Sequence, residues 1–285
     1  MFLLPRFAIA PQHSMENYTL TQVIPNTHIL ESDSIDSLLI NPGRKLLGLP
    51  RMNAAFQATT TWCRALVEKN FLPQNPRDIC TITILAEALG HNLPAALSTA
   101  HAPHSHRGDN FLGVSRFALP KTEQDPYTPF DARVKYLRIE SPAPVWVMLD
   151  TIATGATLVR GLEAAFANAP KPREILLGTP AGSWVGAKKI AELCLREKVQ
   201  LTLFFFGAIF GLWQDGTALP WCHPDTIFSG TPRGQKNRAL TARIFNNIEG
   251  FCSVGDCSAN FFDVTEAEKI LRDEQERFAW RLSRE

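Results

Sequence analysis

The segment best suited to chemistry runs from Val145 to Thr157 and reads VWVMLDTIATGAT. Its first five residues predict a buried strand, which ends at the carboxylate of Asp150. A short loop of small and hydroxyl-bearing residues follows, and the pattern then predicts a helix over residues 157–167. Open α/β sheets bind ligands where a strand ends, and the N–H groups of such a loop and of a helix start attract anions.

Individual side chains of this segment fit the phosphate ester of a sugar. Thr154 and Thr157 carry hydroxyl donors, and Gly155 lets the backbone approach a phosphate closely. Asp150 can accept hydrogen bonds from ribose hydroxyls. A strand, an acidic residue, a turn and a helix also occur together without any ligand, so the pattern alone leaves a purely structural junction open.

The elements that must position this segment alternate between strand and helix over residues 78–210. This alternation predicts an α/β fold, with a mostly parallel sheet and helices on its faces. Strands are predicted at 78–85, 111–116, 135–139, 145–149, 174–178 and 199–206, and helices at 51–72, 157–167 and 186–198. Residues 1–50 contain turn signals at Pro25-Asn26 and Asn41-Pro42-Gly43, and we expect irregular, partly ordered structure there.

Further segments in residues 78–231 resemble those of type I phosphoribosyltransferases, most closely uracil phosphoribosyltransferase, and they follow the order of that family. Besides the loop Thr154–Thr157, they are ILAEALG at 84–90, GVSR at 113–116, KYLR at 135–138, LGTPAG at 177–182, QDGTALP at 214–220 and DTIFSGT at 225–231. The resemblance implies a type I phosphoribosyltransferase fold with a small hood over the carboxyl edge of the sheet.

The same resemblance implies an activity, which is transfer of a phosphoribosyl group from phosphoribosyl pyrophosphate (PRPP) to a nucleobase or related heterocycle. It implies Mg²⁺ as the cofactor, a cytoplasmic homodimer, and Asp150 and Arg116 as the catalytic residues, with Arg116 on pyrophosphate and Asp150 on the ribose. The residues implied to bind the ligand are Asp150, Thr151, Ala153, Thr154, Gly155, Ala156, Thr157, Ala218 and Asp225. Of these, Asp225 and the backbone near Ala218 would face the base.

The chain also departs from the family. Ala86 stands where the family has the arginine of its pyrophosphate loop, and Glu87 follows it. Bulky residues at 221–223 (WCH) stand where the hood of the family has glycines. Two alternatives therefore stay open: a non-catalytic protein that binds a nucleotide or ribose phosphate, and an enzyme that uses another ribose-phosphate compound.

Histidines suggest two further sites. His101, His104 and His106 lie near Asp109 and could bind a divalent metal, but their spacing fits no closed four-ligand site. We interpret this stretch as a solvated polar loop and predict no metal site built from protein ligands. His223 is open to two interpretations, a general acid/base or a packed turn histidine.

Composition limits the remaining classes. Hydrophobic residues make up 45% of the 285 residues and charged residues 20%, and the net charge is +1, so we expect a globular protein that binds neither nucleic acid nor a membrane. The apolar run at 201–213 is too short to cross a bilayer and predicts a buried strand that leads into a turn. We expect an N-terminal extension and helix (1–77), a phosphoribosyltransferase-like core and hood (78–231), and a C-terminal helical extension (232–285).

Overall fold

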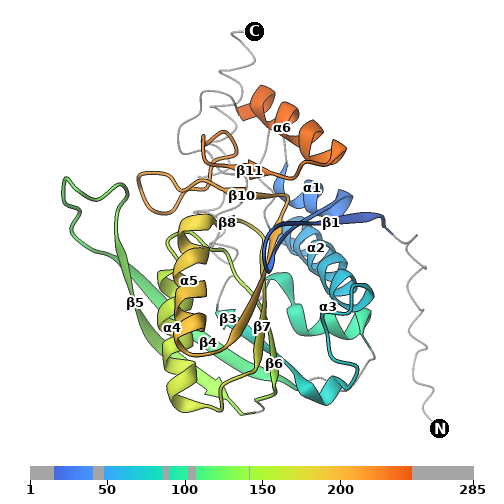
Figure 1. Cartoon of the computed structure of the whole chain (residues 1–285), viewed down its shortest axis with the longest axis vertical. Helices are drawn as coiled ribbons and strands as arrows, with labels where there is room; N and C mark the ends of the chain where they lie inside the picture. Colours follow the sequence, from blue (N-terminus) through green and yellow to red (C-terminus); the bar gives the residue numbers. More distant parts are fainter. Residues whose placement is uncertain (1–15, 41–47, 86–89, 102–106, 141, 246–285) are drawn as a thin grey trace.

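A computed structural model describes residues 16–40, 48–85, 90–101, 107–140 and 142–245 of the chain. An eight-stranded sheet with helices on both faces forms its centre (Figure 1). The strands of this sheet are β1 (Tyr18–Ile24), β2 (Thr27–Ser32), β3 (Ile79–Leu85), β4 (Arg107–Ala118), β5 (Phe130–Ile139), β6 (Val145–Leu149), β7 (Glu174–Thr179) and β9 (Gln200–Phe206).

The strands lie in the order β1-β2-β9-β7-β6-β3-β4-β5. Every neighbouring pair from β2 to β4 is parallel, whereas β1 and β5 join the two edges in antiparallel fashion. The α/β fold with a mostly parallel sheet is thereby confirmed. The strand predicted at 145–149 coincides with β6, which is buried along its whole length as expected of a central parallel strand.

Helices cover each face of the sheet and close a separate hydrophobic core there. On one face lie α1 (Asp33–Leu39), α2 (Gly48–Glu68) and α3 (Leu93–Ala100); on the other lie α4 (Ala156–Asn168) and α5 (Trp184–Arg196) (Figure 1). Alternate residues of β6 belong to the two cores, because side chains of a strand point to opposite faces: Val147 belongs to the core that contains Trp62 of α2, and Met148 belongs to the core that contains Leu162 of α4.

A second, three-stranded sheet lies above the carboxyl edge of the first. It consists of β8 (Gly182–Ser183), β10 (Ala208–Phe210) and β11 (Ile227–Phe228), and α6 (Pro232–Phe245) follows it (Figure 1). The chain turns from β9 into β10 at Gly207, whose φ is +72°, a conformation that favours glycine. The buried strand and turn predicted for residues 201–213 are confirmed.

The prediction of irregular structure before residue 50 is wrong for residues 18–39. Here β1 and β2 form a hairpin that turns at Asn26, whose φ is +56°, and β2 pairs in parallel with β9. The turn signal at Pro25-Asn26 was correct, but the strands on both sides of it were overlooked. A short 3-10 turn, η1 (Pro76–Asp78), then leads into β3, so the N-terminal segment shares the central sheet and its core.

Among the described residues, no helix combines the length and the apolar character that crossing a membrane requires. Three cysteines that form no disulfide, Cys63, Cys80 and Cys194, are buried, whereas Cys222 is exposed. The remaining two lie outside the described residues.

Candidate functional site

The strand order reverses between β3 and β6. From β3 the chain proceeds outward to β4 and β5, and it then returns to the other side of β3 to continue with β6, β7 and β9. Parallel α/β sheets bind ligands in the crevice outside the carboxyl ends of two such strands. The predicted segment, from Asp150 to α4, lies at this switch point, because β6 ends at Leu149.

A turn of the chain after β7 holds the loop that follows β6. The N–H of Ile152 donates to the carbonyl of Ala181 at 2.9 Å, and the N–H of Ser183 donates to the carbonyl of Ile152 at 2.7 Å. The Ser183 hydroxyl donates to the carbonyl of Ala153 at 2.5 Å and accepts from the N–H of Gly186 at 2.9 Å. Ser183 is thus the N-cap of α5, and its hydroxyl also holds the loop after β6 by a hydrogen bond.

Glycines permit this close packing. Gly155 has a φ of +78° and is the N-cap of α4, and a Cβ atom on it would lie 2.6 Å from the carbonyl oxygen of Gly186. A Cβ on Gly186 would in turn lie 2.4 Å from the carbonyl oxygen of Ala153. Gly155 was predicted for its backbone freedom, whereas Ser183 and Gly186 were overlooked, because their contact with the loop is made across 30 residues of sequence.

The loop presents unused hydrogen-bond donors. The N–H groups of Gly155, Ala156 and Thr157 have no acceptor among the described residues, as is usual for the first turn of a helix. The side chain of Thr154 is 2% exposed, and its hydroxyl is buried without a hydrogen-bond partner in the described part of the chain. A buried hydroxyl without a partner is costly, and this one lies beside a helix N-terminus, where the N–H groups attract anions.

Asp150 and Thr151 follow β6 directly and are largely buried, with 6% and 7% exposure. The N–H of Asp150 donates to the carbonyl of Gly178 at 3.2 Å, which holds the backbone of Asp150 against the end of β7. The loop thus brings together Asp150, Thr151, Ala153, Thr154, Gly155, Ala156 and Thr157, all of the predicted ligand-binding residues at this strand end.

Arg116 lies on β4, at the same edge of the sheet. Leu85, the last residue of β3, pairs with Gly113, so Arg116 lies three residues beyond the end of β3. It is half-buried, and its guanidinium lies 4.9 Å from the ring centroid of Phe130 on β5. The loop that contains Ala86 and Glu87, between β3 and α3, lies outside the described residues.

Ala218 and Asp225 lie in the small sheet's layer. Ala218 is buried, its N–H donates to Asp215 at 2.9 Å, and its carbonyl accepts from the N–H of Trp213 at 3.0 Å. Asp225 is exposed and lies 3.8 Å from Nδ1 of His223. His223 packs edge-on against Trp213.

Asp225 also lines a mostly apolar cavity of about 390 Å³ between α5 and the small sheet. Its walls include Trp184, Phe210, Leu212 and Ile227. Val185, another wall residue, immediately precedes Gly186, which contacts the loop after β6. The first turn of α5 therefore contacts both the cavity, through Val185, and the loop after β6, through Gly186.

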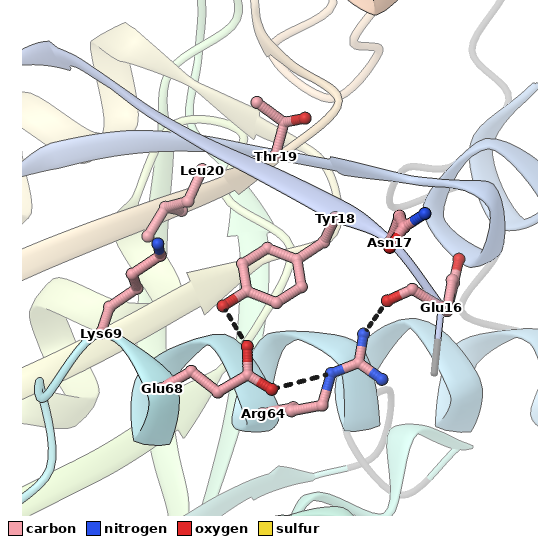
Figure 2. Close-up of a pocket in the computed structure, with 8 residues that line it drawn as sticks. All are labelled: Glu16, Asn17, Tyr18, Thr19, Leu20, Arg64, Glu68 and Lys69. Carbon is pink, nitrogen blue, oxygen red and sulfur yellow. Dashed lines mark hydrogen bonds and ion pairs between the residues drawn. The ribbon is translucent and has the colours of Figure 1, made fainter. Parts of the chain in front are cut away.

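A different cavity, of about 510 Å³, lies beside the C-terminal half of α2 (Figure 2). Its polar groups satisfy one another: Tyr18 donates to Glu68 at 2.6 Å, and Arg64 contacts Glu68 at 3.6 Å and the backbone carbonyl of Glu16. Burial, and then the hydrogen bond to Glu68, raise the pKa of Tyr18 to about 12. We interpret this network as the means by which α2 holds β1.

No group of three or more histidine, cysteine, aspartate or glutamate side chains lies close enough to hold a metal within the described ranges. Of the histidine cluster, His104 and His106 lie outside those ranges. The switch-point loop offers one carboxylate, from Asp150, and hydroxyl oxygens. Such hard oxygen donors suit Mg²⁺, which keeps several waters and is bound through one or two carboxylates plus substrate phosphates.

No protein-family model matches the chain, and no curated protein matches it. Among solved structures, protein AQ2163 from Aquifex aeolicus is 16% identical with a TM-score of 0.44, over 64% of this chain and 85% of that one. Adenine phosphoribosyltransferase from Trypanosoma brucei is 15% identical with a TM-score of 0.42, over 77% and 99%. Hypoxanthine-guanine phosphoribosyltransferase from L. donovani is 16% identical with a TM-score of 0.31, over 61% and 86%. These are similarities of fold alone.

Proposed function

We propose that the chain binds PRPP at the switch point between β3 and β6 and transfers its phosphoribosyl group to a nucleobase or related heterocycle. The observation that carries the proposal is the buried hydroxyl of Thr154, which has no partner in the described chain and adjoins the unused N–H groups at the start of α4. These donors suit the 5′-phosphate, because a helix N-terminus attracts anions.

The other residues take roles that follow from their positions. Asp150, at the end of β6, would accept hydrogen bonds from the ribose hydroxyls and hold the sugar for attack at C1. Arg116, at the same edge, would bind the leaving pyrophosphate as a bidentate donor. Mg²⁺, bound through phosphate oxygens and the Asp150 carboxylate, would neutralise the charge that develops on the leaving group.

The apolar cavity beside the loop supports a heterocycle as the acceptor. Its walls can pack against a planar ring, and Asp225 supplies one carboxylate that can accept a hydrogen bond from a ring N–H. Trp221, Cys222 and His223 stand where uracil phosphoribosyltransferase has glycines, and these bulky side chains would reshape or fill the base pocket, which argues against uracil as the acceptor. A cytoplasmic homodimer stays a prediction of the resemblance.

Calorimetric titration tests this proposal. The full chain is titrated with PRPP in Mg²⁺ and in chelator, and with ribose 5-phosphate. We expect Mg²⁺-dependent binding of PRPP that is at least about tenfold tighter than that of ribose 5-phosphate, because two anionic groups are then held instead of one. Absence of binding for both ligands would show that the loop is a structural junction.

A second candidate is a protein that senses a nucleotide or ribose phosphate without catalysis. The replacement of the family's loop arginine by Ala86 favours it, because catalysis needs charge stabilisation on the pyrophosphate. Equal affinity for PRPP and ribose 5-phosphate, without turnover of PRPP in the presence of a panel of nucleobases, would support this candidate. Turnover of another ribose-phosphate compound would instead indicate an enzyme with a different donor.

A further inference from the structure

Arg116 and Phe130 are diagonal neighbours on the paired strands β4 and β5. Arg116 pairs with Ala132, and Phe130 pairs with Ala118, so both side chains lie on the same face of the sheet. The guanidinium carbon of Arg116 lies over the ring of Phe130, 4.9 Å from its centroid. A cation in this position is attracted to the ring, so Phe130 restricts where the guanidinium lies.

The face that carries these two side chains is the one that α4 covers. Val114, two residues before Arg116, points toward α4, because a Cβ atom on Gly161 would lie 3.3 Å from its side chain. Phe130 and Ala156 both line a separate cavity of about 390 Å³ between α4, α5 and the start of β5. Ala156 is the first residue of α4 and belongs to the loop with the unused N–H donors, so Phe130 borders the proposed phosphate site.

Phe130 also contacts the hood turn, residues 213–218 between β10 and β11. Gly216 has a φ of +74°, and a Cβ atom on it would lie 3.0 Å from the Phe130 ring and 2.4 Å from the carbonyl oxygen of Thr128. The N–H of Thr128 donates to the carbonyl of Gln214 at 2.9 Å. The connection between β4 and β5 therefore lies against the hood turn, which supports the ring of Phe130 from a second side (Figure 1).

A ring that already holds an arginine reduces the cost of ordering its long side chain when an anion binds. Contact with the ring uses none of the five N–H donors of the guanidinium. We propose that Phe130 is a positioning residue, which holds Arg116 for the diphosphate group of PRPP and is itself held by the hood turn. This inference rests on the proposed function, in which Arg116 binds the pyrophosphate.

The hood turn brings the base side of the site into the same arrangement. Within the turn, the carboxylate of Asp215 accepts a hydrogen bond from the N–H of Ala218 at 2.9 Å, and Gly216 is the next residue after Asp215. Gly216 has no role toward a ligand in the proposed function. A substitution at Gly216 should nevertheless change the hold on Arg116, because it displaces the ring of Phe130.

Phe130→Leu, with Phe117→Leu as its control, tests the inference. Phe117 is adjacent to Arg116 on β4, but its side chain points to the opposite face and is 47% exposed. The full chain is titrated calorimetrically with PRPP in Mg²⁺ and with ribose 5-phosphate. We expect Phe130→Leu to weaken PRPP binding at least about fivefold while ribose 5-phosphate binding changes less than about twofold. Phe117→Leu should leave both affinities unchanged.

Two more variants separate positioning from general damage to the fold. Phe130→Tyr keeps the aromatic ring and should bind PRPP within about twofold of the wild type. Gly216→Ala should weaken PRPP binding selectively, as Phe130→Leu does, whereas Gly230→Ala is its control, because nothing lies within 4 Å of a Cβ atom there. An unchanged PRPP affinity in Gly216→Ala would exclude the hood turn as the support of Phe130.

The titrations distinguish failure of the inference from failure of the proposed function. Equal loss of both affinities, or an unchanged PRPP affinity, in folded Phe130→Leu would overturn the inference while PRPP still binds the wild type more tightly than ribose 5-phosphate. Equal wild-type affinities for the two ligands would refute the pyrophosphate contact, and the inference with it, but leave the phosphate loop. Binding of neither ligand by the wild type refutes the proposed function itself.

A measurement on the wild type covers the case in which Phe130→Leu does not fold. Nuclear Overhauser contacts between the ring protons of Phe130 and the δ-methylene of Arg116 are recorded without ligand and at saturating PRPP. We expect them in both states, because the ring holds the arginine before and after binding. Their loss on addition of PRPP would show that Arg116 leaves the ring in order to bind, and the positioning role would be excluded.

Discussion

Gly155 and Gly186 touch through their backbones, so that a Cβ atom on Gly155 would lie 2.6 Å from the carbonyl oxygen of Gly186. Gly155 is the N-cap of α4, and Gly186 lies in the first turn of α5. Ser183, the N-cap of α5, links the two helix starts, because its hydroxyl donates a hydrogen bond to the carbonyl of Ala153. The loop after β6 is therefore backed by protein on one side, and its unused donors are held in place before any ligand arrives, which lowers the ordering cost of binding.

This contact predicts a large difference among glycine substitutions. Gly155→Ala should destabilise the protein by at least about 2 kcal/mol, because it adds both a left-handed non-glycine residue and a steric overlap. Gly230→Ala is the control, since nothing lies within 4 Å of a Cβ there and its φ is not in the left-handed region. Urea unfolding measures both variants, and equal stabilities would contradict the packing described here.

Removal of the Thr154 hydroxyl should separate stability from binding. Thr154→Val deletes a buried hydroxyl without a partner in the described chain, so the ligand-free protein should be equally stable or slightly more stable. The affinity for ribose 5-phosphate should fall about tenfold or more, since a hydrogen bond to a charged group is lost. Thermal unfolding and calorimetric titration measure the two effects.

Thr81→Val is the matched control for that substitution. Thr81 also has a buried hydroxyl without a partner in the described chain, but it lies near the beginning of β3, away from the carboxyl edge. We expect its ribose 5-phosphate affinity to equal that of the wild type. If the two variants bind alike, Thr154 is not part of a phosphate site.

Local patterns predicted the elements around the site well. The five apolar residues before Asp150 predicted the buried strand β6, and the residue types of the loop that follows predicted an anion-binding turn. The hairpin of β1 and β2 was missed because the pairing of β2 with β9, Thr27 with Leu203 for example, joins residues far apart in the sequence and gives no local signal.

The sequence could not show which polar groups of the site lack partners or which distant residues contact the loop, because both depend on the folded structure. Nothing near Thr154 in the sequence indicates that its hydroxyl lacks a partner, because partners come from the folded neighbourhood. Ser183 likewise lies 30 residues after Ala153 in the sequence, and only the packing of α5 brings it to the loop after β6. The resemblance to a known family pointed to Arg116 and Asp150 but could not supply this additional residue.

Asp150→Asn should reduce turnover of PRPP about 100-fold or more in a protein that still folds. The change removes the charge that would hold the ribose and Mg²⁺ but keeps the shape of the side chain. Asp131→Asn is the control, because that carboxylate is on β5, is 42% exposed and pairs with Arg160 at 3.4 Å. Steady-state rates with PRPP and a responsive nucleobase measure both; similar rates in the two variants would remove Asp150 from the mechanism.

The buried ring of His91 should make the protein acid-sensitive. Its pKa is lowered to about 3, first by burial and then by Arg51, whereas in the unfolded chain it lies near 6.5. Between these two values the unfolded chain binds a proton that the folded chain does not, so stability decreases as the pH falls through this window. From pH 7.5 to pH 5.0 the loss due to His91 alone should be about 2 kcal/mol.

His91→Asn isolates this effect, because an asparagine amide can still donate to Thr59 but does not titrate. The variant should lose about 2 kcal/mol less than the wild type between the two pH values in urea unfolding, even if its stability at pH 7.5 is itself reduced. His28→Asn serves as a control, since burial lowers the pKa of His28 as well, but no arginine contributes to that shift. A His91→Asn protein with the pH dependence of the wild type would show that His91 takes up its proton equally in the folded and the unfolded chain.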